Sequence, residues 1–185
     1  MARIYVITGP SAVGKTTVAN RLLEARPTLR KVVTCTSRPI REHEVDGVDY
    51  HFLDRDAMRA MIDGGKMFEH ADVYGRLYGS RMSDVDAITA TGTDVLFVID
   101  VQGARKVKHD HPEAVTIFID AATTEELVSR MEARDKGATA NRAERIAAID
   151  AERAYGMECD HRVVNPQGAL AETVRTVGEI MDRQN

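Results

Sequence analysis

The hydrophobic pattern alternates between short apolar runs and segments whose apolar positions recur at helical spacing. The runs at 4–8, 93–99 and 115–119 are apolar on both faces, as strands buried inside a parallel sheet are. A shorter run follows at 162–164. Because strand-like and helix-like segments alternate, the pattern predicts an α/β chain whose parallel sheet is covered by helices on both faces.

The helix signals are clearest in three places. A helical segment is expected at 15–25, directly after a glycine-rich turn. Thr123 and Glu126 have the spacing of a capping box, which predicts a helix start with an apolar stripe through Leu127, Val128 and Met131. The chain ends on an amphipathic helix whose apolar positions are Leu170, Val174, Val177, Ile180 and Met181.

The segment from 34 to 82 interrupts this alternation with short mixed elements. Strand-like pieces are expected at 48–52, 66–71 and 76–81, around one helix capped by Asp54. An insertion of this kind between two sheet strands usually serves a substrate. We therefore expect a core formed by 1–33 and 83–185, a sub-domain at 34–82, and a short polar lid at about 134–142.

Composition narrows the possible partners. The formal net charge is −4 with a pI of about 5.9, and aromatic residues make up 5% of the chain. These values disfavour a basic surface or a stacking platform for nucleic acid. No apolar run is long enough to span a bilayer and no secretory signal is evident, while Cys35 and Cys159 lack metal-ligand spacing. A cytoplasmic protein is expected, without nucleic-acid or membrane partners.

Residues 9–16, GPSAVGKT, fit the phosphate-loop pattern G-x-x-x-x-G-K-[ST] between a strand and a helix. Backbone N–H groups of such a loop and the following helix N-terminus favour phosphate oxygens. Lys15 would reach the β and γ phosphates of ATP, and the Thr16 hydroxyl would ligate Mg²⁺. The alternative is a glycine turn with an incidental lysine. The expected ATP-binding residues here are Gly9, Ser11, Ala12, Val13, Gly14, Lys15, Thr16 and Thr17.

Asp100 ends the apolar strand at 93–99. Ligands of open α/β sheets collect at the carboxyl ends of the strands, so this carboxylate is expected to face the same crevice as the phosphate loop. It is a second candidate Mg²⁺ ligand or an acceptor for ring N–H groups of a substrate. The alternative is a helix cap for the segment that starts near Gln102.

The insertion carries further ordered motifs. Arg38 and Arg41 form a fork suited to a phosphate monoester, and the runs EVDGVDYHF at 44–52, FEHA at 68–71 and YGRLYGS at 74–80 follow. With the phosphate loop, IDVQGA at 99–104 and the late VVN at 163–165, these motifs resemble guanylate kinase over nearly the whole chain. The resemblance implies a five-stranded parallel P-loop sheet, a mixed α/β GMP-binding insertion and a short lid.

The resemblance implies an acceptor site with two parts. Its phosphate-binding residues would be Arg38, Arg41, Tyr50 and Tyr78, and its guanine-binding residues Thr34, Glu69, Ser80 and Asp100. The chemistry agrees, because a carboxylate such as Glu69 accepts both the N1–H and the N2–H of guanine, whereas adenine presents a lone pair at N1. The alternatives are a surface glutamate at 69 and core packing for the two tyrosines.

The resemblance also implies lid residues and a base contact for ATP. Arg134 and Arg145 match the paired lid arginines, so the expected catalytic residues are Lys15, Arg41, Arg134 and Arg145. Arg130 and Arg142 are possible helpers, against the alternative of solvated helix pairs such as Glu126 with Arg130. Asn165 would lie near the adenine of ATP.

A few positions differ from the usual family pattern. Ala12 and Asp135 stand where glycine is common, Val98 replaces a frequently acidic residue, Arg76 replaces asparagine and Pro166 replaces aspartate. Arg76 adds positive charge near the expected acceptor site. These differences concern affinity, lid behaviour and base contacts rather than the class of reaction.

The predicted reaction is transfer of a phosphoryl group from MgATP to GMP, and to dGMP, by positioning and charge neutralisation. Both the insertion and the lid are expected to close over the bound substrates. The rivals are a catalytically inactive phosphopeptide-binding module of the same fold and a related ribose bisphosphokinase. A monomer or small homo-oligomer is expected.

Overall fold

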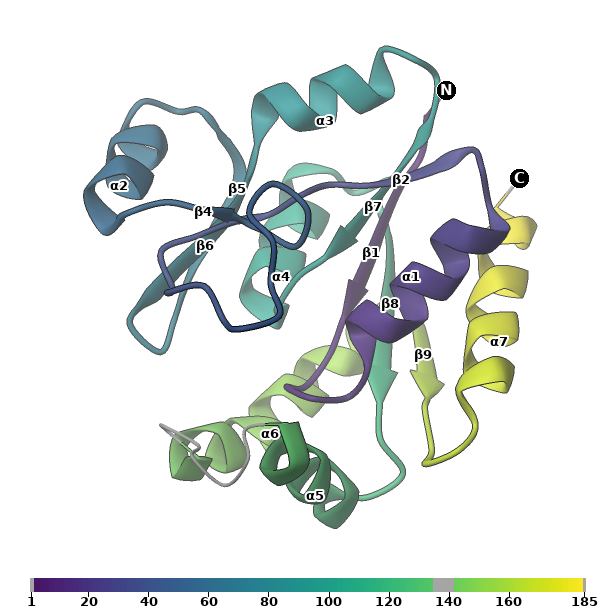
Figure 1. The fold of residues 1–185 in the computed structure, drawn as a ribbon. Coiled ribbons are helices and arrows are strands. Elements are labelled where there is room, and N and C mark those ends of the chain that lie inside the picture. The colour runs from purple at the N-terminus through teal and green to yellow at the C-terminus, as the bar shows by residue number, and fades with distance from the viewer. Residues whose placement is uncertain (1, 135–141, 185) are drawn as a thin grey trace.

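A five-stranded, all-parallel sheet forms the centre of the computed structural model, which describes residues 2–134 and 142–184, without the side chains of 134, 142, 144 and 145. The strand order is β2-β7-β1-β8-β9 (Figure 1). The strands are β1 (Ile4–Thr8), β2 (Leu29–Lys31), β7 (Asp94–Val98), β8 (Val115–Asp120) and β9 (His161–Val164). The predicted five-stranded parallel sheet is therefore confirmed.

Helices cover both faces of this sheet. On one face α1 (Lys15–Ala25) and α7 (Leu170–Arg183) pack side by side, and Leu22 and Val177 lie in the same buried cluster as Ile7 and Ile117. The other face is covered by α3 (Met82–Thr89) and α4 (Val101–Asp110), which pack Val85 and Val107 against Phe97. Burial of these apolar side chains is the main force that holds the layers together.

Two further helices, α5 (Thr124–Arg134) and α6 (Arg142–Gly156), lie beyond the carboxyl ends of the strands, where the phosphate loop also lies (Figure 1). Thr123 Oγ1 accepts from Glu126 N at 3.2 Å, as the capping box predicts. The Glu126 carboxylate, however, accepts from Ala122 N at 3.2 Å. The reciprocal bond of the box is thus displaced by one residue.

A second sheet, β4-β3-β6-β5, forms the insertion and packs on α2 (Arg55–Asp63). Its strands are β3 (Cys35–Thr36), β4 (His51–Phe52), β5 (Met67–Val73) and β6 (Arg76–Arg81). Only β3 and β4 run parallel. Asp54 caps α2 as predicted, accepting from Ala57 N at 2.6 Å.

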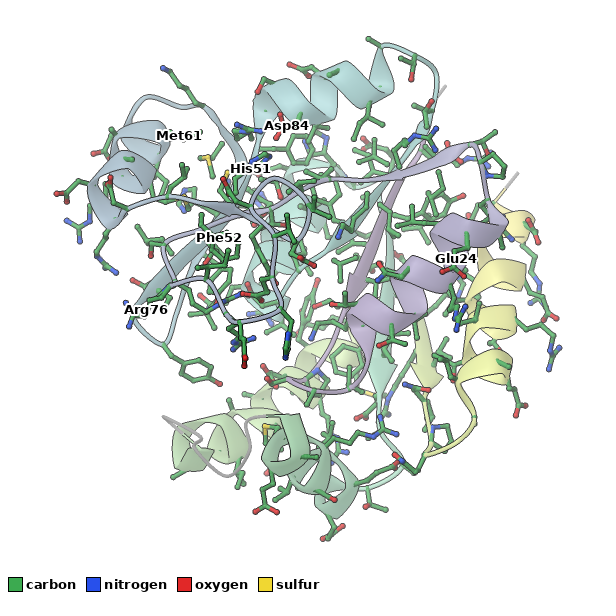
Figure 2. The ribbon with its side chains drawn as sticks, viewed as in Figure 1. Glu24, His51, Phe52, Met61, Arg76 and Asp84 are labelled. Carbon is green, nitrogen blue, oxygen red and sulfur yellow. The ribbon has the colours of Figure 1, made fainter. Side chains whose placement is uncertain are left out.

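The insertion and the core meet through a polar contact as well as through the backbone. Arg81 donates to His51 Nε2 of β4 at 2.6 Å and to Asp84 of α3 at 2.7 Å, and Figure 2 shows His51 and Asp84 side by side. This contact ties the second sheet to a helix of the core. Separate movement of 34–82 stays a prediction, and most of the expected lid lies outside the described residues.

The sequence pattern missed several elements. Strands β2 and β3 are three and two residues long, too short for a periodic signal. Helices α3, α4 and α6 mix apolar and polar positions without a clear start signal except for Asp100 before α4. Within the described residues, no helix combines the length and apolar character that crossing a bilayer requires.

Candidate active site

The phosphate loop connects β1 to α1 in an unusual backbone conformation. Gly9 has a φ of 139°, and a Cβ there would lie 2.0 Å from the Ile119 carbonyl oxygen of β8. Only glycine fits this position. Gly14, with a φ of 102°, precedes the first turn of α1, and Ala12 has a φ of 64° although it carries a side chain. A strand, a glycine-rich loop and a helix N-terminus thus follow one another, the arrangement that binds anions in phosphate loops.

Lys15 and Thr16 lie in the first turn of α1, and both line the cleft described below. The Lys15 ammonium group donates to the carbonyl oxygens of Gly9 and Pro10 at 2.6 and 2.9 Å. The lysine therefore folds back over the loop, so that its charge lies where the loop would hold phosphates.

Arg130 and Asn165 support the loop from behind. Arg130 donates to the Val13 and Asn165 carbonyl oxygens at 3.1 and 2.8 Å and pairs with Glu126 at 2.5 Å. Asn165 is 6% exposed and donates from Nδ2 to Val13 O at 2.9 Å. The Glu126–Arg130 pair is therefore a partly buried brace rather than a solvated helix pair, and Asn165 does not line the cleft.

One cleft of about 750 Å³ lies between the phosphate loop, the end of β7, the second sheet and α6. It brings together most of the residues predicted from the sequence: Gly9, Ser11, Ala12, Val13, Gly14, Lys15, Thr16, Thr17, Thr34, Arg38, Arg41, Tyr50, Glu69, Tyr78 and Asp100. Residues from the core and from the insertion thus share one cavity of a size suited to nucleotide ligands.

Glu69 is the most buried acid of the cleft, with 1% of its surface exposed. Ser80 lies behind it and donates its hydroxyl to Glu69 Oε1 at 2.7 Å. Burial raises the pKa of Glu69 to about 7, against the opposing effect of the Ser80 hydrogen bond. A Cβ at Gly103 would lie 2.6 Å from Glu69 Oε2, so a glycine in α4 leaves room for the carboxylate.

Asp100 caps α4 and also lines the cleft. Its Oδ1 accepts from Gln102 N at 2.7 Å and from Gly103 N at 3.3 Å, so the helix-cap alternative is realised. Both bonds use the same oxygen. Among the described residues no hydrogen bond uses the second oxygen of this cleft-lining carboxylate, so capping and ligand binding are compatible.

The arginine fork is organised by Glu44, which sequence reasoning did not assign. Arg38 donates hydrogen bonds from both terminal nitrogens to the Glu44 carboxylate, at 2.7 and 2.8 Å. The backbone N–H of Arg41 donates to the same carboxylate at 2.9 Å. Burial favours the neutral acid, but the Arg38 and Arg41 hydrogen bonds outweigh it and lower the pKa of Glu44. The Arg38 guanidinium also lies 5.2 Å from the centre of the Tyr50 ring.

Glu152 of α6 is a second cleft acid that sequence reasoning missed. Burial raises its pKa to about 7, with nearby Lys15 opposing and Asp100 adding to the shift. Its neighbour Arg153 holds the helix in place, donating to the fully buried Asp120 at 3.1 Å and to Thr124 at 2.8 Å. The resemblance had pointed to Arg145 of α6, but nothing in the sequence pattern marked Glu152 as a cleft residue.

The cleft offers two hard oxygen donors to a magnesium ion, the Thr16 hydroxyl and the second oxygen of Asp100. Mg²⁺ characteristically takes one or two protein oxygens and completes its shell with substrate phosphates and water. Among the described residues no group of three acidic, histidine or cysteine side chains could hold a metal alone. The donor set therefore fits an ion that arrives with a nucleotide. The predicted lid residues Arg134 and Arg145 have side chains outside the described ones.

Comparison with known proteins places this architecture in a family. The guanylate kinase family profile matches residues 1–184. The guanylate kinase of Symbiobacterium thermophilum is 38% identical over 184 residues, which cover 94% of this chain and 87% of that protein. The guanylate kinase of Bordetella pertussis is 36% identical over 170 residues, 92% of this chain and 79% of that one.

The fold agrees with the sequence match. The crystal structure of guanylate kinase from Anaplasma phagocytophilum superposes with a TM-score of 0.82 at 30% identity, covering 99% of this chain and 86% of that one. A profile match over nearly the whole chain, relatives well above 30% identity and a shared fold all agree. The chain belongs to the guanylate kinase family.

Proposed function

We propose that the cleft transfers the γ-phosphoryl group of ATP to the phosphate of GMP, giving GDP and ADP, through the residues assigned below. The family reaction is the ATP-dependent phosphorylation of GMP. The observation that carries the acceptor assignment is a nearly fully buried carboxylate, Glu69, in a cavity that also contains a phosphate loop.

The acceptor side binds the base and the phosphate separately. Glu69 accepts the N1–H and N2–H donors of guanine, with Ser80, Thr34 and Asp100 around it. AMP is rejected because its N1 lone pair would face the carboxylate and leave a buried charge unpaired. Arg38, Arg41, Tyr50 and Tyr78 hold the phosphate, and the bond to Glu44 keeps Arg38 oriented for it. The base and the phosphate carry the proposed contacts, and dGMP shares both with GMP, so dGMP is proposed as a second acceptor.

The donor side is the phosphate loop. Loop N–H groups and Lys15 bind the ATP phosphates, and Thr16 with the second oxygen of Asp100 would hold Mg²⁺. When bound, Mg²⁺ neutralises and orients the ATP phosphates. The adenine contact implied for Asn165 stays a prediction, since its amide lies behind the loop and is hydrogen-bonded to Val13.

The transfer needs no general base. An oxygen of the GMP phosphate is already anionic and attacks the γ-phosphorus of ATP, while the bond to the bridging oxygen breaks and ADP leaves. Lys15, Arg41, Arg134 and Arg145 neutralise charge on the transferring group. Closure of the insertion and of the lid excludes water, which would otherwise hydrolyse ATP.

The proposal extends to the location of the protein and to its partners. Cys35 and Cys159 are free thiols, which fits the reducing cytoplasm. ATP and GMP are the partners, and a monomer or small homo-oligomer suffices because the described residues of one chain already form the cleft.

A coupled assay of ADP release tests the proposal with GMP, dGMP, AMP, UMP and ribose 1,5-bisphosphate as acceptors. Turnover with GMP and dGMP, and little with AMP, is the expected result. Turnover only with the sugar phosphate favours the related ribose bisphosphokinase activity. Absence of turnover with every acceptor favours a binding module.

A further inference from the structure

Arg76 lies on the β5–β6 hairpin, on the face that also carries the proposed acceptor residues. In its antiparallel register Glu69 pairs with Ser80, Ala71 with Tyr78, and Val73 with Arg76. Side chains of directly paired residues point to the same face of a sheet. Leu77, between Tyr78 and Arg76, points the other way into the buried cluster with Met58. Arg76 therefore shares the face of Tyr78 and Ser80.

Contacts from two sides hold the hairpin tip in place. Tyr74 and Gly75, with φ of 53° and 74°, form a tight two-residue turn. Arg55 of α2 donates to the Gly75 carbonyl oxygen at 2.7 Å, and Gln102 of α4 donates to the Asp72 carbonyl oxygen at 3.2 Å. Figure 2 shows Arg76 at this outer end of the hairpin. The start of β6 is thus fixed at the mouth of the cleft.

Arg76 differs from several other cations of the cleft because its charge is unused. Lys15 is bonded to loop carbonyl groups, Arg38 to Glu44 and Arg130 to Glu126. Arg76 lines the same cleft and is exposed, and among the described side chains none forms a hydrogen bond or ion pair with its guanidinium group. A guanidinium that faces a nucleotide cleft without a protein partner is free to bind an anion.

The position of Arg76 along β6 indicates which anionic group of the substrates it would bind. At about 3.3 Å per residue, Arg76 lies about 13 Å along β6 from Ser80, which contacts Glu69, and about 7 Å beyond Tyr78. It is therefore on the phosphate side of the acceptor and away from the base. An arginine side chain is long enough to reach back toward Tyr78.

We propose that Arg76 is a further phosphate-binding residue, which contacts the phosphate oxygens of the acceptor nucleotide from the mouth of the cleft. The proposal rests on the proposed function. Arg76 would raise the affinity for the acceptor phosphate and would not contribute to the recognition of guanine or of ATP.

The test compares full-length Arg76→Ala with Arg59→Ala and with Arg76→Lys. Arg59 is an exposed arginine of α2 that does not line the cleft, so its removal makes the same change in net charge. For Arg76→Ala we expect the KM for GMP to rise about five- to tenfold, with the KM for ATP unchanged, as loss of one partly exposed charge-assisted hydrogen bond implies. Arg59→Ala should behave as the wild type, and Arg76→Lys should recover part of the affinity.

Calorimetry with GMP and with guanosine separates a phosphate contact from a structural effect. Arg76→Ala should weaken GMP binding and leave guanosine binding unchanged. The proposal is overturned if GMP binding weakens no more than in Arg59→Ala, or if guanosine binding weakens equally. Wild-type enzyme without turnover on GMP would instead refute the proposed function, and that measurement is made first.

Discussion

In the proposed function, Glu69 links folding to substrate choice at the scale of a single residue. Its carboxylate is almost fully buried, is hydrogen-bonded to Ser80 and occupies the room that the missing side chain of Gly103 leaves. Such burial is costly for a charged carboxylate unless further donors join the Ser80 hydroxyl. Guanine supplies two donors, so the group best suited to select this base is also the one that benefits most from binding it.

The raised pKa of Glu69 predicts that base binding strengthens as the pH rises. With a pKa of about 7, about one tenth of the carboxylates are ionised at pH 6 and most are at pH 8. The dissociation constant for guanosine should therefore be several-fold, up to about tenfold, larger at pH 6 than at pH 8. Guanosine is the suitable ligand because it has no phosphate that titrates in this range.

Calorimetric titration of guanosine at pH 6, 7 and 8 measures this dependence. Glu69→Gln serves as the control and should give a weak, flat profile. Wild-type affinity that stays constant over the same range, or that improves in acid, would rule out the ionised carboxylate as the acceptor of the guanine donors.

At the scale of an element, the phosphate loop carries local strain. Ala12 adopts a φ of 64°, a left-handed conformation that costs an L-residue about 1–2 kcal/mol. Glycine relieves that cost but adds entropy to the unfolded chain. The net effect of Ala12→Gly should be a small gain in the free energy of unfolding, about 0.5 kcal/mol.

The matched control is Ala60→Gly, at an exposed position inside α2. Glycine in a helix interior costs about 1 kcal/mol relative to alanine, so this variant should be less stable than the wild type. Urea unfolding of the wild type, Ala12→Gly and Ala60→Gly gives the sign of each change in the free energy of unfolding. Equal destabilisation by both substitutions would show that the loop does not hold Ala12 under strain.

The elements that could be predicted from the sequence are those with strong local signals. The glycine pattern identified the loop before α1, and the apolar runs identified β1, β7 and β8. The resemblance pointed to Arg145 of α6, but the place of Glu152 in the cleft wall could not be predicted, because the tertiary contact between Arg153 and Asp120 holds this part of the helix. The Glu126–Arg130 pair was named as an alternative from the sequence, whereas the bond of Glu44 to Arg38 and that of Arg130 to Val13 become apparent only in the folded chain.

At the scale of the whole molecule, an acidic chain concentrates positive charge in one place. The net charge is −4, yet six cationic side chains line the cleft, Lys15, Arg38 and Arg41 among them, together with five acidic ones. Cations grouped in a cleft attract anionic ligands and raise their local concentration, and the five acids offset part of this effect. Two polyanionic nucleotides can therefore be bound without a basic surface elsewhere.

The two-sheet architecture predicts closure on substrate binding. Most of the proposed acceptor residues belong to the insertion and the phosphate loop belongs to the core, so we expect the two ligands together to draw these parts toward each other. Small-angle X-ray scattering should show a smaller radius of gyration with GMP plus a non-hydrolysable ATP analogue than with neither ligand. An unchanged radius of gyration would mean that the insertion and the core are already closed.

The central claim is that Glu69 selects GMP in a cleft where Lys15 binds the donor, and steady-state kinetics of Glu69→Gln test it most directly. Replacing one acceptor oxygen by an amide donor should lower kcat/KM for GMP at least about a hundredfold, because a buried donor would then face guanine donors. The dissociation constant for ATP should stay within about twofold of the wild type. Unchanged kcat/KM for GMP in this variant would contradict the account.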